Sequence, residues 1–149
     1  MAGNLFTKHV LIVDDTPSIR RLICKALQAE GCECRQAENG FAALEQLKKE
    51  HFDLVLTDYH MPLMDGMKFL ERLAEQLDSD DSPLTIMMTS DCDAAVQHQA
   101  IKAGAYLVLQ KTCDFHQLVS QVMKVFTLKP NSCEICRNNQ ECARDSKGN

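Results

Sequence analysis

The chain alternates short apolar runs with stretches whose apolar residues recur every three to four positions. Runs of five or six residues that are apolar almost throughout are typical of strands buried on both faces of a sheet. The second run alternates only weakly, which favours a place at a sheet edge. The predicted strands cover residues 8–13, 32–37, 52–57, 84–88 and 105–109.

The intervening stretches predict five amphipathic helices. In the first, Ile19, Leu22 and Ile23 begin an i, i+3, i+4 pattern that places them on one face. Thr16 is expected to cap this helix, with Pro17 in its first turn and Gly31 just past its end. The predicted helices cover residues 17–30, 41–49, 67–77, 92–103 and 115–126.

Regular alternation of strand and helix predicts an α/β fold. We expect a doubly wound (βα)5 domain, with a parallel five-stranded sheet and helices on both faces. A chain of 149 residues is long enough for one such domain with a sizeable core.

Polar residues follow four of the predicted strands at their carboxyl ends. Asp14 and Asp15 follow the first strand, Asp58 the third, Thr89 the fourth and Lys111 the fifth. In an open parallel sheet, ligands bind outside these ends, where the strand order reverses. If these four strands are contiguous, the side chains converge on one pocket.

These side chains are chemically complementary. Three crowded carboxylates repel one another unless a cation neutralises them, and oxygen ligands suit Mg²⁺. A lysine and a hydroxyl beside one carboxylate can stabilise a transferring phosphoryl group, with Asp58 as the nucleophile. Each residue alone has an ordinary interpretation as a cap or a surface group, so the joint pattern carries the prediction.

The sequence resembles the receiver domain of two-component response regulators over residues 8 to about 128. The most specific part is Asp58-Tyr59-His60-Met61-Pro62-Leu63-Met64-Asp65-Gly66. Val13-Asp14-Asp15, Thr89-Ser90, and Gly104-Ala105 leading to Lys111 support it. The resemblance implies a CheY-like, flavodoxin-like sheet of order 2-1-3-4-5 and a receiver domain over residues 1–130.

The resemblance also implies a Mg²⁺ site and a phosphoryl donor. Asp58 accepts the phosphoryl group from a phosphohistidine on a sensor histidine kinase or a phosphotransfer protein. Asp15, Asp58 and the backbone carbonyl of His60 are the implied metal ligands, and Asp14 acts through metal-bound water. The position of His60 in this family also affects the rate of phosphate loss.

The implied outcome is a phosphorelay switch, not turnover of a substrate. Lys111 contacts the phosphate, and Thr89 moves toward it and carries the following loop along. The surface formed by residues 92–103, 105–109 and 115–126 then changes its preference for a downstream protein, and a homodimer through this surface is a second option. The protein is expected to catalyse only its own phosphorylation and dephosphorylation.

Two positions depart from the family pattern. Thr112 stands where a proline usually follows the lysine, which disfavours a cis peptide bond there. Val108 stands where an aromatic residue often acts as a rotamer switch, and Tyr106 lies two residues earlier on the same face. The aromatic switch is therefore not predicted, whereas the phosphorylation chemistry is.

The polar segment 131–149 has neither helix nor strand periodicity and is expected to be a short flexible tail. Cys133, Cys136 and Cys142 have a spacing seen in metal sites, but zinc or an iron–sulfur cluster usually takes four ligands. Cys113, His116 or another chain could supply the fourth. Three interpretations of these cysteines therefore remain open: a metal site, a redox-sensitive thiol pair, or cysteines without a specific role.

Composition narrows the remaining options. A net charge of −5 does not favour nucleic-acid binding, and no apolar run reaches the length of a membrane helix. The N-terminus lacks the features of a signal peptide, so a cytoplasmic location is expected. We expect no DNA-binding or catalytic output domain within this length, so the expected output is contact with another protein.

Three other functions are alternatives to a receiver domain. A flavodoxin-like cofactor binder is disfavoured because Asp14 and Asp15 would repel a phosphate. A metal-dependent phosphohydrolase is disfavoured for two reasons. Such enzymes usually have a general acid at the position of His60, and they carry a cap domain, which is not expected in this chain. The third is a metal- or redox-responsive regulator that uses the tail cysteines, with the receiver as an auxiliary part.

Overall fold

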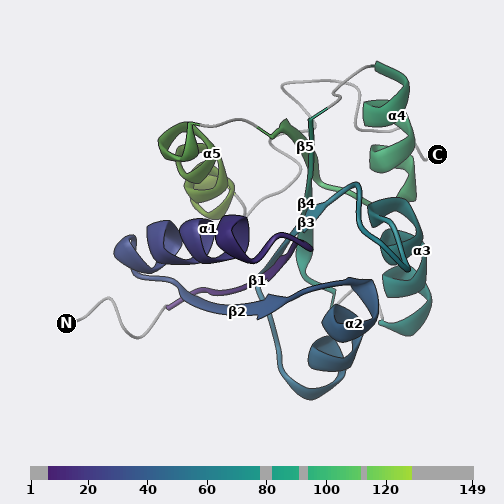
Figure 1. The fold of residues 1–149 in the computed structure, drawn as a ribbon, viewed down its shortest axis with the longest axis horizontal. Coiled ribbons are helices and arrows are strands. Elements are labelled where there is room, and N and C mark those ends of the chain that lie inside the picture. The colour runs from purple at the N-terminus through teal and green to yellow at the C-terminus, as the bar shows by residue number, and fades with distance from the viewer. Residues whose placement is uncertain (1–6, 78–81, 91–93, 112–113, 129–149) are drawn as a thin grey trace. The chain divides into compact units, whose positions relative to one another are not determined.

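The computed structural model describes residues 7–77, 82–90, 94–111 and 114–128 (Figure 1). The chain divides into two compact units, residues 1–115 and 116–149.

The first unit is built on a parallel five-stranded sheet in the order β2-β1-β3-β4-β5, which confirms the predicted fold. Val13 pairs with Ala37 on one side and with Thr57 on the other, so the carboxyl ends of the three strands lie level. The strands are β1 His9–Val13, β2 Glu33–Ala37, β3 Leu54–Asp58, β4 Leu84–Thr89 and β5 Leu107–Gln110.

Four helices belong to this unit and cover both faces of its sheet. Figure 1 shows α1 on one side and α2, α3 and α4 on the other. Their bounds are α1 Pro17–Ala29, α2 Gly40–Lys49, α3 Gly66–Gln76 and α4 Ala94–Ala103. The last helix, α5 Phe115–Leu128, lies almost wholly in the second unit. Among the described helices, none is long and apolar enough to span a membrane.

The core explains why the strands read as continuous apolar runs. Leu11, Val13 and Val55 are fully buried in a cluster with residues of α2, α3 and the loop after β3. Ile12 and Leu56, which alternate with them along β1 and β3, are also fully buried. Because both faces of β1 and β3 are covered, the pairing register of these strands is strongly specified. The positions of the residues that follow them are therefore well defined.

Side chains of the connecting loops cap the helices. The Asn39 side chain accepts a hydrogen bond from Ala42 N at 2.8 Å, and Asp65 accepts one from Lys68 N at 2.9 Å. Thr16 occupies the predicted N-cap position of α1, but its side chain makes no capping hydrogen bond. Asp14 Oδ1 instead accepts the Thr16 N–H at 2.8 Å, which ties the start of α1 to the end of β1.

Gly66 allows α3 to begin directly against the end of β3. Its N–H donates to the Tyr59 carbonyl at 2.8 Å, and a Cβ at this position would lie 2.7 Å from the Asp58 carbonyl oxygen. The obstacle is main chain, which cannot move aside without disturbing Asp58.

We therefore expect Gly66→Ala to lower the free energy of unfolding by about 1–3 kcal/mol, as overpacking does elsewhere. Gly40→Ala is the matched control, since a Cβ there meets the side chain of Met64, which can adjust. Urea denaturation of both variants measures the difference. Equal stability of the two variants would contradict this account of Gly66.

Candidate functional site

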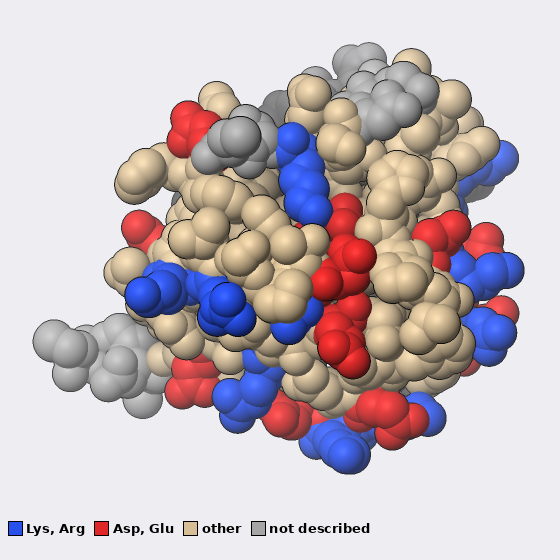
Figure 2. Space-filling view, viewed as in Figure 1, with Lys and Arg blue, Asp and Glu red and all other residues tan. Residues whose placement is uncertain are grey.

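Three carboxylates meet where the strand order of the sheet reverses. Asp14 and Asp15 follow β1, Asp58 ends β3, and β1 and β3 are hydrogen-bonded neighbours. One carboxylate oxygen from each residue lies within 4.8 Å of the others. Figure 2 shows acidic side chains gathered in a band over the middle of this face, next to lysine and arginine side chains.

Asp14 is completely buried and is held from several sides. Its N–H donates to the Ala37 carbonyl at 3.1 Å, and its Oδ1 accepts the Thr16 N–H. Its Oδ2 lies 2.8 Å from Lys111 Nζ, yet no described donor is aligned to give it a regular hydrogen bond. The ion pair with Lys111 is therefore the contact that holds this oxygen among the described residues.

Lys111, the residue that directly follows β5, extends its side chain into the pocket. Its Nζ lies 2.8 Å from Asp14 Oδ2 and 3.0 Å from Asp58 Oδ2, so one ammonium group bridges two buried carboxylates. Burial lowers the pKa of Lys111, but the two ion pairs outweigh this, so its pKa is raised overall. The main-chain N–H of Lys111 also donates to the main-chain carbonyl of Thr89 at 2.7 Å, which places Thr89 beside the site.

Asp58 is 5% exposed, and its surroundings disfavour the ionised form of its carboxyl group. Burial raises its pKa above the ordinary value, and the charges of Asp14 and Asp15 raise it further. Lys111 acts in the opposite direction through its hydrogen bond and charge. The pocket therefore carries more negative charge than its own lysine neutralises.

The donor set fits a divalent metal ion. Three ionised carboxylates and one ammonium group leave an excess of two negative charges among these four side chains. Oδ2 of Asp14 is buried without a regular hydrogen bond, and Asp15 is exposed and open to a hydrated ion. Oxygen ligands together with access for water are what Mg²⁺ requires, whereas soft metals prefer sulfur and nitrogen.

The loop after Asp58 forms the rim of the pocket. His60 is exposed, and its ring meets that of Tyr59 edge to face with centroids 4.5 Å apart. Leu63 is 79% exposed and adopts a φ of 74°, a left-handed conformation that costs a side-chain-bearing residue about 1–2 kcal/mol. This backbone conformation could not be predicted from the sequence, because leucine is not a residue that favours turns.

Two of the positions that depart from the receiver pattern lie in or directly before β5, Val108 within the strand and Tyr106 just before it. Val108 packs in a cluster with Leu70, Met87 and Ala100. The hydroxyl of Tyr106 is buried and has no hydrogen-bond partner among the described residues, and burial raises its pKa. Thr112 lies outside the described residues, so the expectation about its peptide bond stays a prediction.

The structure brings the three predicted carboxylates close together, and it adds one residue that the sequence pattern did not indicate, next to the main chain of Asp14. Arg20 of α1 donates from Nη1 to the Asp14 carbonyl at 2.6 Å. Its only signal in the sequence is a position one helical turn after Thr16, which does not distinguish it from a surface residue.

The chain belongs to the response regulator receiver domain family, whose model matches residues 10–123. It is 33% identical over 127 residues to sporulation initiation phosphotransferase F of Bacillus subtilis, covering 85% of this chain and 100% of that protein. It is also 35% identical over 132 residues to the transcriptional regulator NtrC of Proteus hauseri, covering 85% of this chain. There it spans only 27% of the relative's length.

Solved structures agree with this assignment. The Vibrio cholerae chemotaxis protein CheY4 superposes with a TM-score of 0.74 at 28% identity, covering 80% of this chain and 98% of that one. The response regulator TrrA of Thermotoga maritima, solved in complex with Mg²⁺ and BeF, gives a TM-score of 0.68 at 31% identity. It covers 80% of this chain and 99% of TrrA. The predicted family is therefore confirmed, and the acidic pocket fits its phosphoacceptor site.

The raised pKa of Asp58 predicts that this residue lowers stability at neutral pH. The folded protein holds the Asp58 proton to a higher pH than the unfolded chain, so ionised Asp58 lowers the free energy of unfolding above its folded pKa. Without Mg²⁺, Asp58→Asn should raise the free energy of unfolding by roughly 1 kcal/mol or more. The gain should shrink as the pH falls through the folded pKa.

Thermal and urea denaturation in EDTA across the pH range would measure this gain. Asp65→Asn is the matched control, because asparagine caps α3 as well as aspartate and the residue lies outside the carboxylate cluster. A stability of Asp58→Asn equal to or below that of the wild type at neutral pH would contradict the prediction.

Proposed function

We propose that the protein is a phosphorelay component in which Asp58 accepts a phosphoryl group. The observation that supports this most directly is the bridge from Lys111 Nζ to Asp58 Oδ2 at 3.0 Å, inside a three-carboxylate pocket. An Asp58 oxygen attacks the phosphorus of a phosphohistidine, the P–N bond breaks, and its electron pair stays on the imidazole. The product is an acyl phosphate on Asp58.

Asp15, Asp58 and the His60 carbonyl would hold Mg²⁺, with Asp14 acting through bound water. When bound, the ion supplies positive charge to the non-bridging oxygens of the phosphoryl group. Lys111 is already directed at Asp58 and supplies the second positive charge. Thr89, held beside Lys111 by the main chain, is proposed to bind the phosphate after transfer.

The proposed donor is a sensor histidine kinase or a phosphotransfer protein, which implies a cytoplasmic location. This agrees with full coverage of sporulation initiation phosphotransferase F, a relative whose name states phosphotransfer. A downstream protein target and a homodimer through α4, β5 and α5 stay predictions. The proposed chemistry consists only of the protein's own phosphorylation and dephosphorylation.

Incubation with acetyl phosphate and Mg²⁺ should add one labile phosphoryl group, detected by intact mass. Asp58→Asn should abolish labelling, and EDTA should prevent it. Lys111→Ala should slow labelling on the order of a hundredfold, because it removes a charge aimed at the transition state. Asp65→Asn, which keeps the cap on α3, should label like the wild type.

Two results would overturn the assignment of Asp58. One is failure of the wild type to label in the presence of Mg²⁺, and the other is undiminished labelling of Asp58→Asn. Peptide mapping after hydroxylamine treatment, which converts an acyl phosphate into a hydroxamate, would locate the modified residue.

The tail cysteines Cys133, Cys136 and Cys142 lie outside the described residues, as does Cys113. The family match ends at residue 123, and no comparison supports a metal- or redox-responsive regulator. A tail metal or redox site stays a prediction, which metal analysis with and without residues 131–149 would test.

A further inference from the structure

We propose that Arg20 is a positioning residue for the acidic pocket, which sets the orientation of the two adjacent carboxylates Asp14 and Asp15. This inference rests on the proposed function of the pocket, because the property that it explains is the binding of Mg²⁺ there.

The Arg20 guanidinium connects three elements. Its Nη1 donates to the Asp14 carbonyl at 2.6 Å, just past the end of β1. Its Nε donates to Gln36 Oε1 on β2 at 3.2 Å. The donors of a planar guanidinium have a fixed geometry, so Arg20, which lies on α1, can bind both acceptors at once.

The Asp14 carbonyl belongs to the peptide group that links Asp14 to Asp15. A peptide group is planar, so a hydrogen bond that fixes the direction of this carbonyl also fixes the direction in which the chain enters Asp15. Asp14 is held at its N–H by Ala37 O and at its Oδ1 by Thr16 N. Arg20 supplies the remaining main-chain contact, and through it the exposed Asp15 is placed relative to Asp58.

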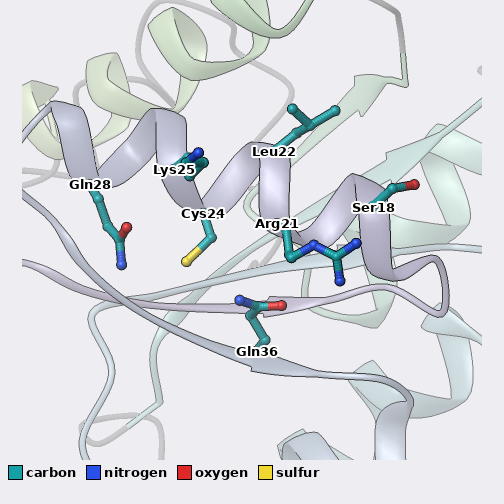
Figure 3. A pocket seen from close by; sticks show the side chains of 7 residues that line it. All are labelled: Ser18, Arg21, Leu22, Cys24, Lys25, Gln28 and Gln36. Atoms are coloured by element: carbon teal, nitrogen blue, oxygen red, sulfur yellow. The ribbon is translucent and has the colours of Figure 1, made fainter.

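Gln36 is itself held from the far side. Its main-chain carbonyl accepts a hydrogen bond from Gln46 Nε2 of α2 at 2.8 Å. Its carboxamide lies beneath α1 in the wall of a cavity of about 560 Å³. Figure 3 shows Gln36 opposite Arg21, the residue after Arg20. The side chain of Arg21 also lines this cavity.

A positive charge near the pocket also has an opposite effect, because it repels Mg²⁺. Arg20 is only partly buried, and water and salt weaken such a repulsion strongly over several ångströms. A charged donor on a carbonyl oxygen is among the stronger hydrogen bonds in a folded protein. We therefore expect the positioning effect to exceed the repulsion.

Titration calorimetry with Mg²⁺, without any phosphoryl donor, tests this directly. Arg20→Gln should weaken Mg²⁺ binding roughly tenfold, as loss of a residue that orients metal ligands does elsewhere. Arg20→Lys keeps the charge and one donor but cannot bridge two acceptors, so its affinity should fall between those of Arg20→Gln and the wild type. Gln36→Ala should weaken binding less than Arg20→Gln.

Arg21→Gln is the matched control, since it removes the same charge one residue away and should leave Mg²⁺ affinity unchanged. In acetyl phosphate labelling, Arg20→Gln should need a higher Mg²⁺ concentration for half-maximal rate. The rate at saturating Mg²⁺ should change much less, and the conservative Arg20→Lys should recover part of the affinity.

Two outcomes would overturn the inference. One is Mg²⁺ binding by Arg20→Gln as tight as, or tighter than, that of the wild type, which would leave only repulsion. The other is a lower melting temperature of the Arg20 variants with unchanged Mg²⁺ affinity, which would mean a purely structural role. If Mg²⁺ affinities follow the expected order but acetyl phosphate fails to label Asp58, the proposed function fails and the inference stands.

Discussion

The mutual repulsion of three carboxylates is the constraint on which the site depends. Asp14, Asp15 and Asp58 are brought within 4.8 Å of one another at the ends of neighbouring strands. Such an arrangement is unfavourable in the absence of a cation. Burial is the main cause of the raised pKa of Asp58, and the charges of Asp14 and Asp15 add to it. The arrangement persists because both faces of β1 and β3 are packed, and because Lys111 bridges Asp14 and Asp58.

Stability and function therefore oppose each other at this point of the fold. The buried core holds the strands so firmly that the chain tolerates an excess of negative charge at their ends. That excess fits the hydrated divalent cation and the phosphoryl group that we propose for this pocket. Gly66 and Leu63 add local constraints, since one permits a close approach to the Asp58 main chain and the other holds a left-handed turn.

The fold was readable because its local signals agree with one another. Strands buried on both faces appear as continuous apolar runs, and helices that cover the sheet on one side appear with a 3.6-residue period. Strand ends were the least certain part: β3 begins at Leu54 and includes Asp58, two residues later at the start and one later at the end than predicted. β5 likewise begins at Leu107, after Tyr106, because pairing with β4 sets its limits.

The residues that could form the site can be identified from the amino-acid sequence, because residue type and position at a strand end are local properties. Asp14, Asp15, Asp58 and Lys111 were identified in this way, and the tertiary structure brings them together. The contacts that hold these residues are visible only in three dimensions: the hydrogen bond from Thr16 N to Asp14, the close approach at Gly66 and the bridge made by Arg20. These contacts depend on where β1, β2 and α1 meet in space, and no spacing along the chain encodes that distance.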